Sequence, residues 1–359
     1  MKIIVIGAGI IGALTAYHLA EAGAEVTVIE AGQPANAASG ASFGWINASF
    51  YLNEDHFRLR CAALEAHRRI QYDLGTTATV WSGCLCWEKE GAAFEAQRAS
   101  LQRLGYAVRV VNRSEFARLE PAVVPPERAL LFEDEGAVDL VRLATDALDA
   151  AAACGARLIS GIEALDIQEV SGRVVGIETP LGMIPADHVV VAAGVATQAL
   201  VRSVGVPLPM LHRPALILRS EPIEPVLAHV LVSPGQELRQ MPDGRLLVPT
   251  VANHQSDDSA QVSSRPDRLA DRAMSRVSAL LDRPLSWHEA TLAARPMPED
   301  GLPVIGAGGP EGIYICTMHS GATLAPLVAE LAAAEVMGAA LTNAQSALLA
   351  PYRPQRFTA

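Results

Sequence analysis

The fold is decided by residues 2–30, which read KIIVIGAGIIGALTAYHLAEAGAEVTVIE. Residues 2–6 form a short apolar run rich in isoleucine and valine, which predicts a buried strand. Apolar residues with helical spacing follow over residues 11–22, and Gly23 is expected to end that helix. Residues 25–30 form a second apolar run and predict another buried strand. A strand, a helix and a strand in this order predict a βαβ unit of a parallel sheet.

The turn before this helix has the pattern GxGxxG, formed by Gly7, Gly9 and Gly12. In a βαβ unit these glycines permit a tight turn, a close backbone approach to a pyrophosphate, and packing of the helix on the strand. The N-terminus of the helix then favours phosphate. Glu30 ends the second strand, where a carboxylate can accept hydrogen bonds from an adenosine ribose. Together these features predict a dinucleotide site; a tight turn without a ligand is the alternative.

Length and charge narrow the classes of protein further. The chain has 359 residues and a formal net charge of -11, so we expect two connected domains. An acidic surface argues against nucleic acid and anionic lipid as partners. The uncharged stretch 3–17 is shorter than the about 20 residues of a membrane-spanning helix. We therefore expect a cytoplasmic protein with no transmembrane segment, and the scattered cysteines suggest no metal site.

The rest of the chain alternates between two kinds of element. Apolar patterning and turn signals predict helices at 54–74, 95–104, 114–119, 139–153, 265–281 and 321–337, with Ser114 and Asp139 at two helix starts. They predict a strand at 80–88, several strands between 157 and 191, antiparallel strands from Ala215 to Val251, and a strand at 313–316, with a loop at 35–49. This order predicts an α/β nucleotide-binding domain interrupted by an α+β, largely antiparallel substrate domain.

Three later segments favour FAD over NAD as the dinucleotide. Residues 38–42, ASGAS, could hold the pyrophosphate from its other side, although any loop of small residues would look the same. Residues 189–194, VVVAAG, would let the chain pass close to the cofactor, or are an ordinary strand end. Residues 318–326, MHSGATLAP, open a helix, with Pro326 expected in its first turn. Its N-terminus would stabilise negative charge on a reduced isoalloxazine.

With these segments the chain resembles the D-amino-acid oxidase (DAO) family of flavoproteins over nearly its whole length. The motifs that carry the resemblance are GAGIIG with Glu30, ASGAS, VVVAAG, RPMPEDGLPVIG and HSGATLAP. It implies a glutathione-reductase-type Rossmann FAD domain with an inserted, largely antiparallel substrate domain. We predict that residues 1–80, 140–212 and 290–359 form the discontinuous FAD-binding domain, and that residues 81–139 and 213–289 form the substrate domain.

The resemblance also implies site residues. The cofactor contacts that it implies are Gly7, Gly9, Ile10, Ile11, Gly12, Glu30, Ala31, Ser39, Ser42, Ile162, Gly194, Gly321, Thr323 and Leu324. Ile162 falls where relatives hold the adenine by their backbone. No cysteine matches a covalent flavin attachment, so we expect noncovalent FAD.

Four further residues are candidates for the substrate side. Arg295 matches the arginine that binds the substrate carboxylate in several relatives, and its planar fork suits that role; the alternative is an arginine that only holds the loop. His319 either touches the substrate or only packs near the flavin edge. Trp45 and Tyr51 either wall the pocket or belong to the core.

These residues lead to one favoured reaction and two alternatives. The favoured one oxidises the C–N bond of a small amino acid, preferably a D-amino acid, by hydride transfer to flavin N5, which gives an imine and then a keto acid. The first alternative acts on a secondary amine such as proline, hydroxyproline, sarcosine or an opine. The second is a nucleotide-binding protein without flavin.

The sequence leaves the electron acceptor open between oxygen, a quinone and a carrier protein. Sarcosine-oxidase-like relatives activate oxygen with a lysine. This chain has only Lys2 and Lys89, neither at the matching place, which favours a dehydrogenase.

Overall fold

A six-stranded, mostly parallel sheet forms the centre of one half of the molecule. The computed structural model describes residues 1–250, 261–262 and 265–358. The strand order is β19-β20-β13-β1-β2-β9, and all neighbours are parallel except β19 and β20. The strands are β1 (Lys2–Ile6), β2 (Glu25–Glu30), β9 (Arg157–Ser160), β13 (His188–Val191), β19 (Val304–Ala307) and β20 (Ile313–Thr317). The predicted βαβ unit is confirmed and lies at the centre of this sheet.

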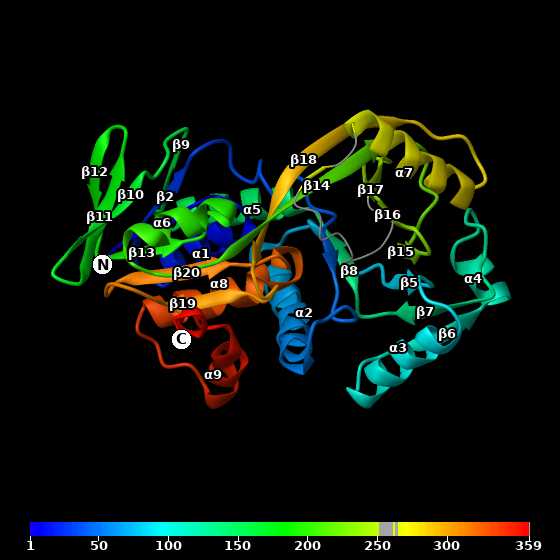
Figure 1. Cartoon of the computed structure of the whole chain (residues 1–359), viewed down its shortest axis with the longest axis horizontal. Coiled ribbons are helices and arrows are strands. Elements are labelled where there is room, and N and C mark those ends of the chain that lie inside the picture. The colour runs from blue at the N-terminus through cyan, green and yellow to red at the C-terminus, as the bar shows by residue number, and fades with distance from the viewer. Residues whose placement is uncertain (251–260, 263–264, 359) are drawn as a thin grey trace.

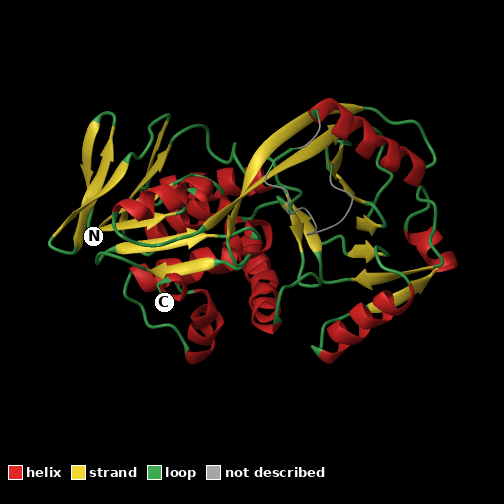
Figure 2. Ribbon diagram, viewed as in Figure 1, coloured by secondary structure: helices red, strands yellow, loops and turns green. Residues whose placement is uncertain are grey.

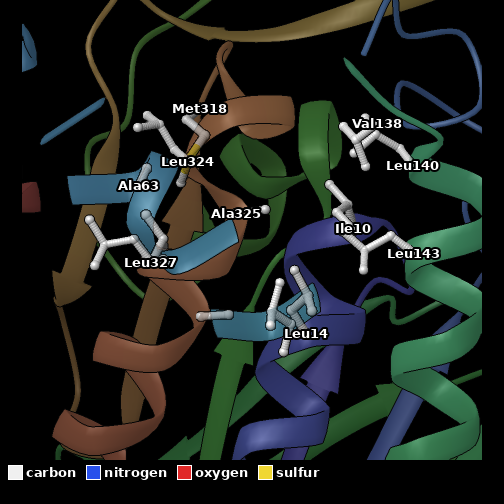
Figure 3. Close-up of a cluster of buried hydrophobic side chains, with 14 of the residues drawn as sticks. Ile10, Leu14, Ala63, Val138, Leu140, Leu143, Met318, Leu324, Ala325 and Leu327 are labelled. Atoms are coloured by element: carbon white, nitrogen blue, oxygen red, sulfur yellow. The ribbon is translucent and has the colours of Figure 1, made fainter. Parts of the chain in front are cut away.

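Helices α1 (Ile10–Glu21), α2 (Glu54–Leu74), α5 (Leu140–Ala153) and α8 (Gly321–Val336) pack together on this half. Their apolar side chains meet in one core (Figure 3). In it, Leu14 of α1 lies near Leu143 of α5, and Leu327 of α8 lies near Ala63 of α2. The predicted helix at 139–153 is confirmed with its cap, because the Asp139 side chain accepts hydrogen bonds from two backbone N–H groups of the first turn.

A smaller layer covers the opposite side. It contains a three-stranded antiparallel sheet, β10 (Asp166–Val170), β11 (Arg173–Thr179) and β12 (Gly182–Pro185), with η1 (Gly194–Ala196) and α6 (Thr197–Ser203). Turns at Ser171-Gly172 and Pro180-Leu181 join these strands, which lie within the predicted multi-strand segment 157–191. A second apolar core lies between this layer and the parallel sheet.

The other half is built on an eight-stranded sheet of order β18-β14-β17-β16-β15-β5-β7-β6. The strands are β5 (Cys84–Cys86), β6 (Arg109–Asn112), β7 (Arg128–Phe132), β14 (Met210–Ser220), β15 (Val230–Ser233), β16 (Gln236–Gln240), β17 (Leu246–Pro249) and β18 (Trp287–Pro298). All neighbours are antiparallel except β15 and β5. The largely antiparallel prediction is therefore confirmed; Val251, its predicted end, lies outside the described residues.

The paired strands β14 and β18 run from the first half into the second, and α7 (Pro266–Leu280) lies beside them (Figure 1). Figure 2 shows α3 (Gly91–Arg103), α4 (Arg113–Leu119) and α7 at the outer side of the second half. The chain ends with α9 (Asn343–Leu349), η2 (Ala350–Tyr352) and η3 (Pro354–Phe357). Within the described residues, no helix has both the length and the apolar character needed to cross a membrane.

Several predicted boundaries are wrong. The predicted loop 35–49 contains strand β3 (Trp45–Ile46). The predicted strand 80–88 is two strands, β4 (Thr79–Val80) and β5, because Gly83 between them has a φ of +72° and turns the chain.

Two helix starts also differ from the prediction. Helix α3 begins at Gly91 and not at Glu95. Helix α4 is capped by Asn112 and not by Ser114, because the Asn112 side chain accepts the Glu115 N–H.

A second three-stranded sheet joins segments from both predicted domains. Strand β8 (Gly136–Val138) lies between β3 and β4. The fold thus has the two predicted parts, while the exact domain boundaries stay a prediction.

Candidate functional site

The glycine turn after β1 leaves no room for side chains. Gly7 has a φ of +101°, and a Cβ there would lie 2.5 Å from the Ala192 carbonyl oxygen. A Cβ on Gly12 would lie 1.9 Å from the Gly7 carbonyl oxygen. Real Cβ atoms do not approach backbone so closely, so both positions require glycine. Gly12 therefore serves the packing of α1 on the turn, as the pattern predicts.

Glu30 is held at the end of β2 by backbone donors. One of its carboxylate oxygens accepts the Ala8 N–H at 2.7 Å and the other accepts the Gly32 N–H at 2.8 Å. Each oxygen retains capacity for a further hydrogen bond. The carboxylate is thus fixed beside the glycine turn, where a ribose hydroxyl could donate to it.

Ser39 lies over the tip of α1. Its hydroxyl oxygen accepts the Ile10 N–H at 3.0 Å, and Ile10 is the first residue of that helix. Arg219 from β14 donates to the Gly40 carbonyl oxygen at 2.9 Å and so ties the ASGAS loop to the second half of the molecule. The loop therefore closes over a helix N-terminus, as the prediction for a pyrophosphate site requires.

One pocket, called here the first pocket, brings both predicted helix N-termini together. A Cβ on Gly321, at the start of α8, would lie 3.7 Å from Ile11 Cδ1 and 3.9 Å from Ile10 Cγ2. The predicted residues that line this pocket are Gly7, Gly9, Ile10, Ile11, Glu30, Ala31, Ser39, Ser42, Gly194, His319 and Gly321. Segments far apart in sequence thus form one elongated site.

Three of the predicted cofactor contacts lie outside the lining of this pocket and of the second pocket described next. Gly12 packs behind the turn, and Leu324 is fully buried in the core between α8 and its neighbours (Figure 3). The Ile162 N–H donates to the Glu30 carbonyl oxygen at 3.1 Å, whereas Glu163 and Ala164 line the first pocket.

A second pocket adjoins the first. The two share the lining residues Ala38, Ser42, Pro296, His319 and Ala322. Arg295 and Thr323 line the second pocket only, and Ala294 lines only the first. Neighbouring residues of β18 thus serve different pockets, in keeping with the alternation of side chains along a strand.

Arg295 is half-buried and held in the sheet. It lies opposite Arg213 in the β14–β18 register, and its Nε donates to the Arg213 carbonyl oxygen at 3.3 Å. Trp45 lines the second pocket, whereas the Tyr51 hydroxyl lies 2.8 Å from Ser100 Oγ, and Tyr51 is absent from both linings.

The sequence interpretation missed four polar residues of the second pocket: Asn47, Arg60, Glu237 and Ser320. A signal existed for Arg60. It stands in the predicted helix 54–74, one turn from Phe57 and Ala63 on the face that turns out to be buried. A lone arginine on an apolar face points to a special role, because arginines are almost never fully buried without a partner.

The first turn of α8 differs from the prediction. Pro326 is the sixth residue of that helix and so lies beyond its first turn. Proline has no N–H to give to the carbonyl of Ala322, four residues earlier. The helix tolerates it because that carbonyl accepts a hydrogen bond at 2.8 Å from Nε2 of His67 on α2.

Comparison with known proteins identifies the kind of site. Residues 2–335 match the family model DAO, described as FAD dependent oxidoreductase. The chain belongs to this family. Its cofactor is therefore FAD, and the interpretation as a nucleotide-binding protein without flavin is set aside.

Three known proteins that are similar to this DAO-family chain each cover at least 89% of it. Glycine oxidase of Pseudomonas putida is 26% identical, with 99% of this chain and 98% of the relative covered. D-amino acid dehydrogenase of Rhizobium johnstonii is 26% identical, covering 89% and 91%. The crystal structure of glycine oxidase from Geobacillus kaustophilus superposes with a TM-score of 0.85 at 23% identity and covers 99% of both chains.

The first pocket of this DAO-family protein fits FAD in chemical terms. At one end a fixed carboxylate, Glu30, stands beside the glycine turn, and at the other the N-terminus of α8 meets Ile10 and Ile11. A helix N-terminus suits the pyrophosphate, and a second suits negative charge on the reduced ring. The Thr323 hydroxyl is already committed, since it donates to the Trp45 carbonyl oxygen and accepts from the Asn47 N–H. Its backbone N–H is also engaged, because it donates to the Ser320 carbonyl oxygen at 3.1 Å.

Proposed function

We propose that this oxidoreductase oxidises the C–N bond of a small amino acid, with D-amino acids preferred. FAD, when bound, supplies the acceptor for the hydride that leaves the substrate Cα. The product is an imine, which water hydrolyses to a keto acid and an amine. The glycine oxidases and D-amino acid dehydrogenases among the relatives support this substrate class.

The observation that carries the proposal is the position of Arg295 beside the junction of the two pockets. Arg295 lines the second pocket, and its neighbours Ala294 and Pro296 line the first. Its guanidinium can hold a carboxylate by two parallel hydrogen bonds. A substrate anchored there extends its Cα toward the shared lining around His319 and Ala322, where we place the reactive edge of the cofactor.

We propose His319 as a residue that contacts the substrate at this junction, since it lines both pockets. No general base is required if the amine arrives uncharged. Arg295 and His319 then act by position and charge, and the pockets restrict access of water to the reacting carbon.

We also propose a dehydrogenase rather than an oxidase. Neither lysine of the chain lines the first or the second pocket; Lys89 lies on a separate pocket near Trp87. A lysine that activates oxygen is therefore missing from the two pockets as the described residues form them. The acceptor is then a quinone or a carrier protein.

Anaerobic bleaching of the bound flavin tests the proposal. Purified protein with FAD would be mixed with D-amino acids, L-amino acids and N-alkyl amino acids, and absorbance followed at about 450 nm, where oxidised flavin absorbs. Fast bleaching by D-amino acids supports the proposal, and fast bleaching only by proline, sarcosine or opines replaces it with secondary-amine oxidation. Readmitted oxygen then restores the colour slowly if the enzyme is a dehydrogenase and quickly if it is an oxidase.

A further inference from the structure

Arg60 is a buried cation held against the tip of α8. It lies on α2 with 3% of its surface exposed. Its Nε donates to the Asn47 carbonyl oxygen at 2.9 Å, and its Nη2 donates to Asn47 Oδ1 at 2.6 Å and to Thr323 Oγ1 at 3.3 Å. All three acceptors are neutral. The guanidinium is therefore fixed in place without being neutralised.

No carboxylate of the described residues lies within ion-pair distance of this guanidinium, and its Nη1 has no hydrogen-bond partner among them. Burial lowers the Arg60 pKa to about 10, while the charge of Glu135 acts in the opposite direction, so the group stays a cation at neutral pH. A buried charge without a partner is costly. Such a residue is expected where it acts on an anion that the protein acquires.

Glu135 does not neutralise Arg60 directly, because its carboxylate is occupied elsewhere. It accepts hydrogen bonds from Trp45 Nε1 at 3.0 Å, from the Ala48 and Ser49 N–H groups, and from the Tyr106 hydroxyl at 2.9 Å. Burial nevertheless raises its pKa to about 7. The negative charge of Glu135, which acts on Arg60, is thus partly lost near neutral pH, and the positive charge of Arg60 is less compensated.

The positive charge of Arg60 could stabilise one of two anions, a carboxylate of the substrate or the reduced flavin. Nη1 has no partner but is buried away from solvent, so Arg60 acts on a ligand at a distance rather than by contact. Its Nη2 bonds to Thr323, which lies in the α8 turn that borders both pockets. Two charges that are not in contact still interact strongly in a dry protein interior, because little water screens them.

We propose that Arg60 supplies a fixed positive charge that stabilises the anionic reduced form of FAD, in addition to the N-terminus of α8. This inference rests on FAD lying in the first pocket with its reactive edge at the lining shared with the second pocket, as proposed above, and not on the identity of the amine. Arg60 would therefore raise the midpoint potential of the flavin and its reactivity toward nucleophiles.

Sulfite provides a probe that needs no substrate. Its sulfur lone pair forms a bond to flavin N5, and the displaced electron pair moves onto the N1–C2 carbonyl region, so the adduct carries the negative charge that Arg60 should stabilise. No leaving group or oxidant is involved. The dissociation constant of sulfite and the two-electron midpoint potential would be measured on the FAD-bound protein.

Arg60→Met should raise the sulfite dissociation constant at least about tenfold and lower the midpoint potential by about 30 mV, the equivalent for a two-electron couple. Arg60→Lys keeps the charge, so its sulfite dissociation constant and midpoint potential should stay near the wild-type values. Arg58→Met is the matched control, because Arg58 lies on the same helix but is exposed and pairs with Asp55 at 2.7 Å. It should change neither quantity.

Asn47→Asp keeps the test decisive if Arg60→Met fails to fold. The new carboxylate is isosteric and would neutralise Arg60 across the 2.6 Å contact that exists already. Like Arg60→Met, this variant should lower the midpoint potential of the flavin and weaken the binding of sulfite. FAD-bound Arg60→Met or Asn47→Asp protein with wild-type potential and sulfite affinity would overturn the inference while leaving amine oxidation untouched.

Discussion

His67 donates a hydrogen bond from Nε2 to the carbonyl oxygen of Ala322 across 2.8 Å, in place of the backbone donor that Pro326 lacks. The imidazole is fully buried, its Nδ1 has no partner among the described residues, and burial lowers its pKa to about 4. It is therefore neutral, with its proton on Nε2. Because Ala322 lines both pockets, α2 supports the turn of α8 on which the site depends.

This relationship predicts coupling between His67 and Pro326. His67→Leu should destabilise the fold by about 1–3 kcal/mol, the cost of a buried carbonyl without a donor. In a Pro326→Ala background the helix can supply its own N–H, so the same change should cost less. Urea unfolding of the four proteins measures the difference as a double-mutant cycle. Equal costs in both backgrounds would contradict the assigned role.

The same histidine predicts a loss of stability in acid. The ordinary histidine pKa is 6.5, and burial lowers it to about 4 for His67. Between these values the unfolded state binds more protons than the folded state, so this contribution is complete above pH 6.5 and is lost as the pH falls through 4. As the pH falls over this interval, the free energy of unfolding of wild type should decrease relative to that of the His67→Leu/Pro326→Ala double variant, which lacks the buried imidazole. A difference independent of pH would show that His67 does not titrate in this way.

Arg295→Ala should weaken capture of a carboxylate substrate by about 2–5 kcal/mol, the range for loss of one partner of a hydrogen-bonded charge pair. The loss should appear in kcat/KM for an amino acid and be small for the corresponding amine without a carboxylate. Arg295→Lys should recover part of it, since lysine keeps the charge but not the fork. Unchanged kcat/KM with every amino acid tested would leave Arg295 a purely structural residue.

The glycine turn predicts two distinct outcomes for alanine. A Cβ at Gly12 would lie 1.9 Å from backbone, so Gly12→Ala should lose both thermal stability and FAD binding. A Cβ at Gly9 would have the Ser39 hydroxyl as its nearest atom, at 3.2 Å, so Gly9→Ala should keep the fold. It should weaken FAD binding, because the new methyl group stands where the pyrophosphate approaches. Circular dichroism melting with FAD titration separates the two.

Much of the cofactor half could be predicted because its signals are local. The glycines of the turn and Glu30 stand within thirty residues, and each is dictated by backbone geometry or by the end of a strand. The second half was less predictable. Strand β6 buries only Val111, and β8 has three residues with partners at Trp45 and Thr79, so neither carries a pattern of its own.

Arg60 shows how far the candidate site could be predicted from the sequence. Its place on the buried face of a predicted helix was visible, but its meaning depends on Asn47 and Thr323, which only the folded chain brings together. The pairing of His67 with Ala322 is equally non-local. Residue type alone cannot show which carbonyl a distant helix will serve.

β14 and β18 form one continuous ribbon, and Arg295 lies well inside its paired register. Arg295, the proposed anchor for the substrate carboxylate, therefore lies on a continuous pair of strands and has little freedom to move. Engineering toward bulkier amines should therefore keep Arg295 and replace other side chains of the second pocket, whose lining includes Trp45 and Leu216.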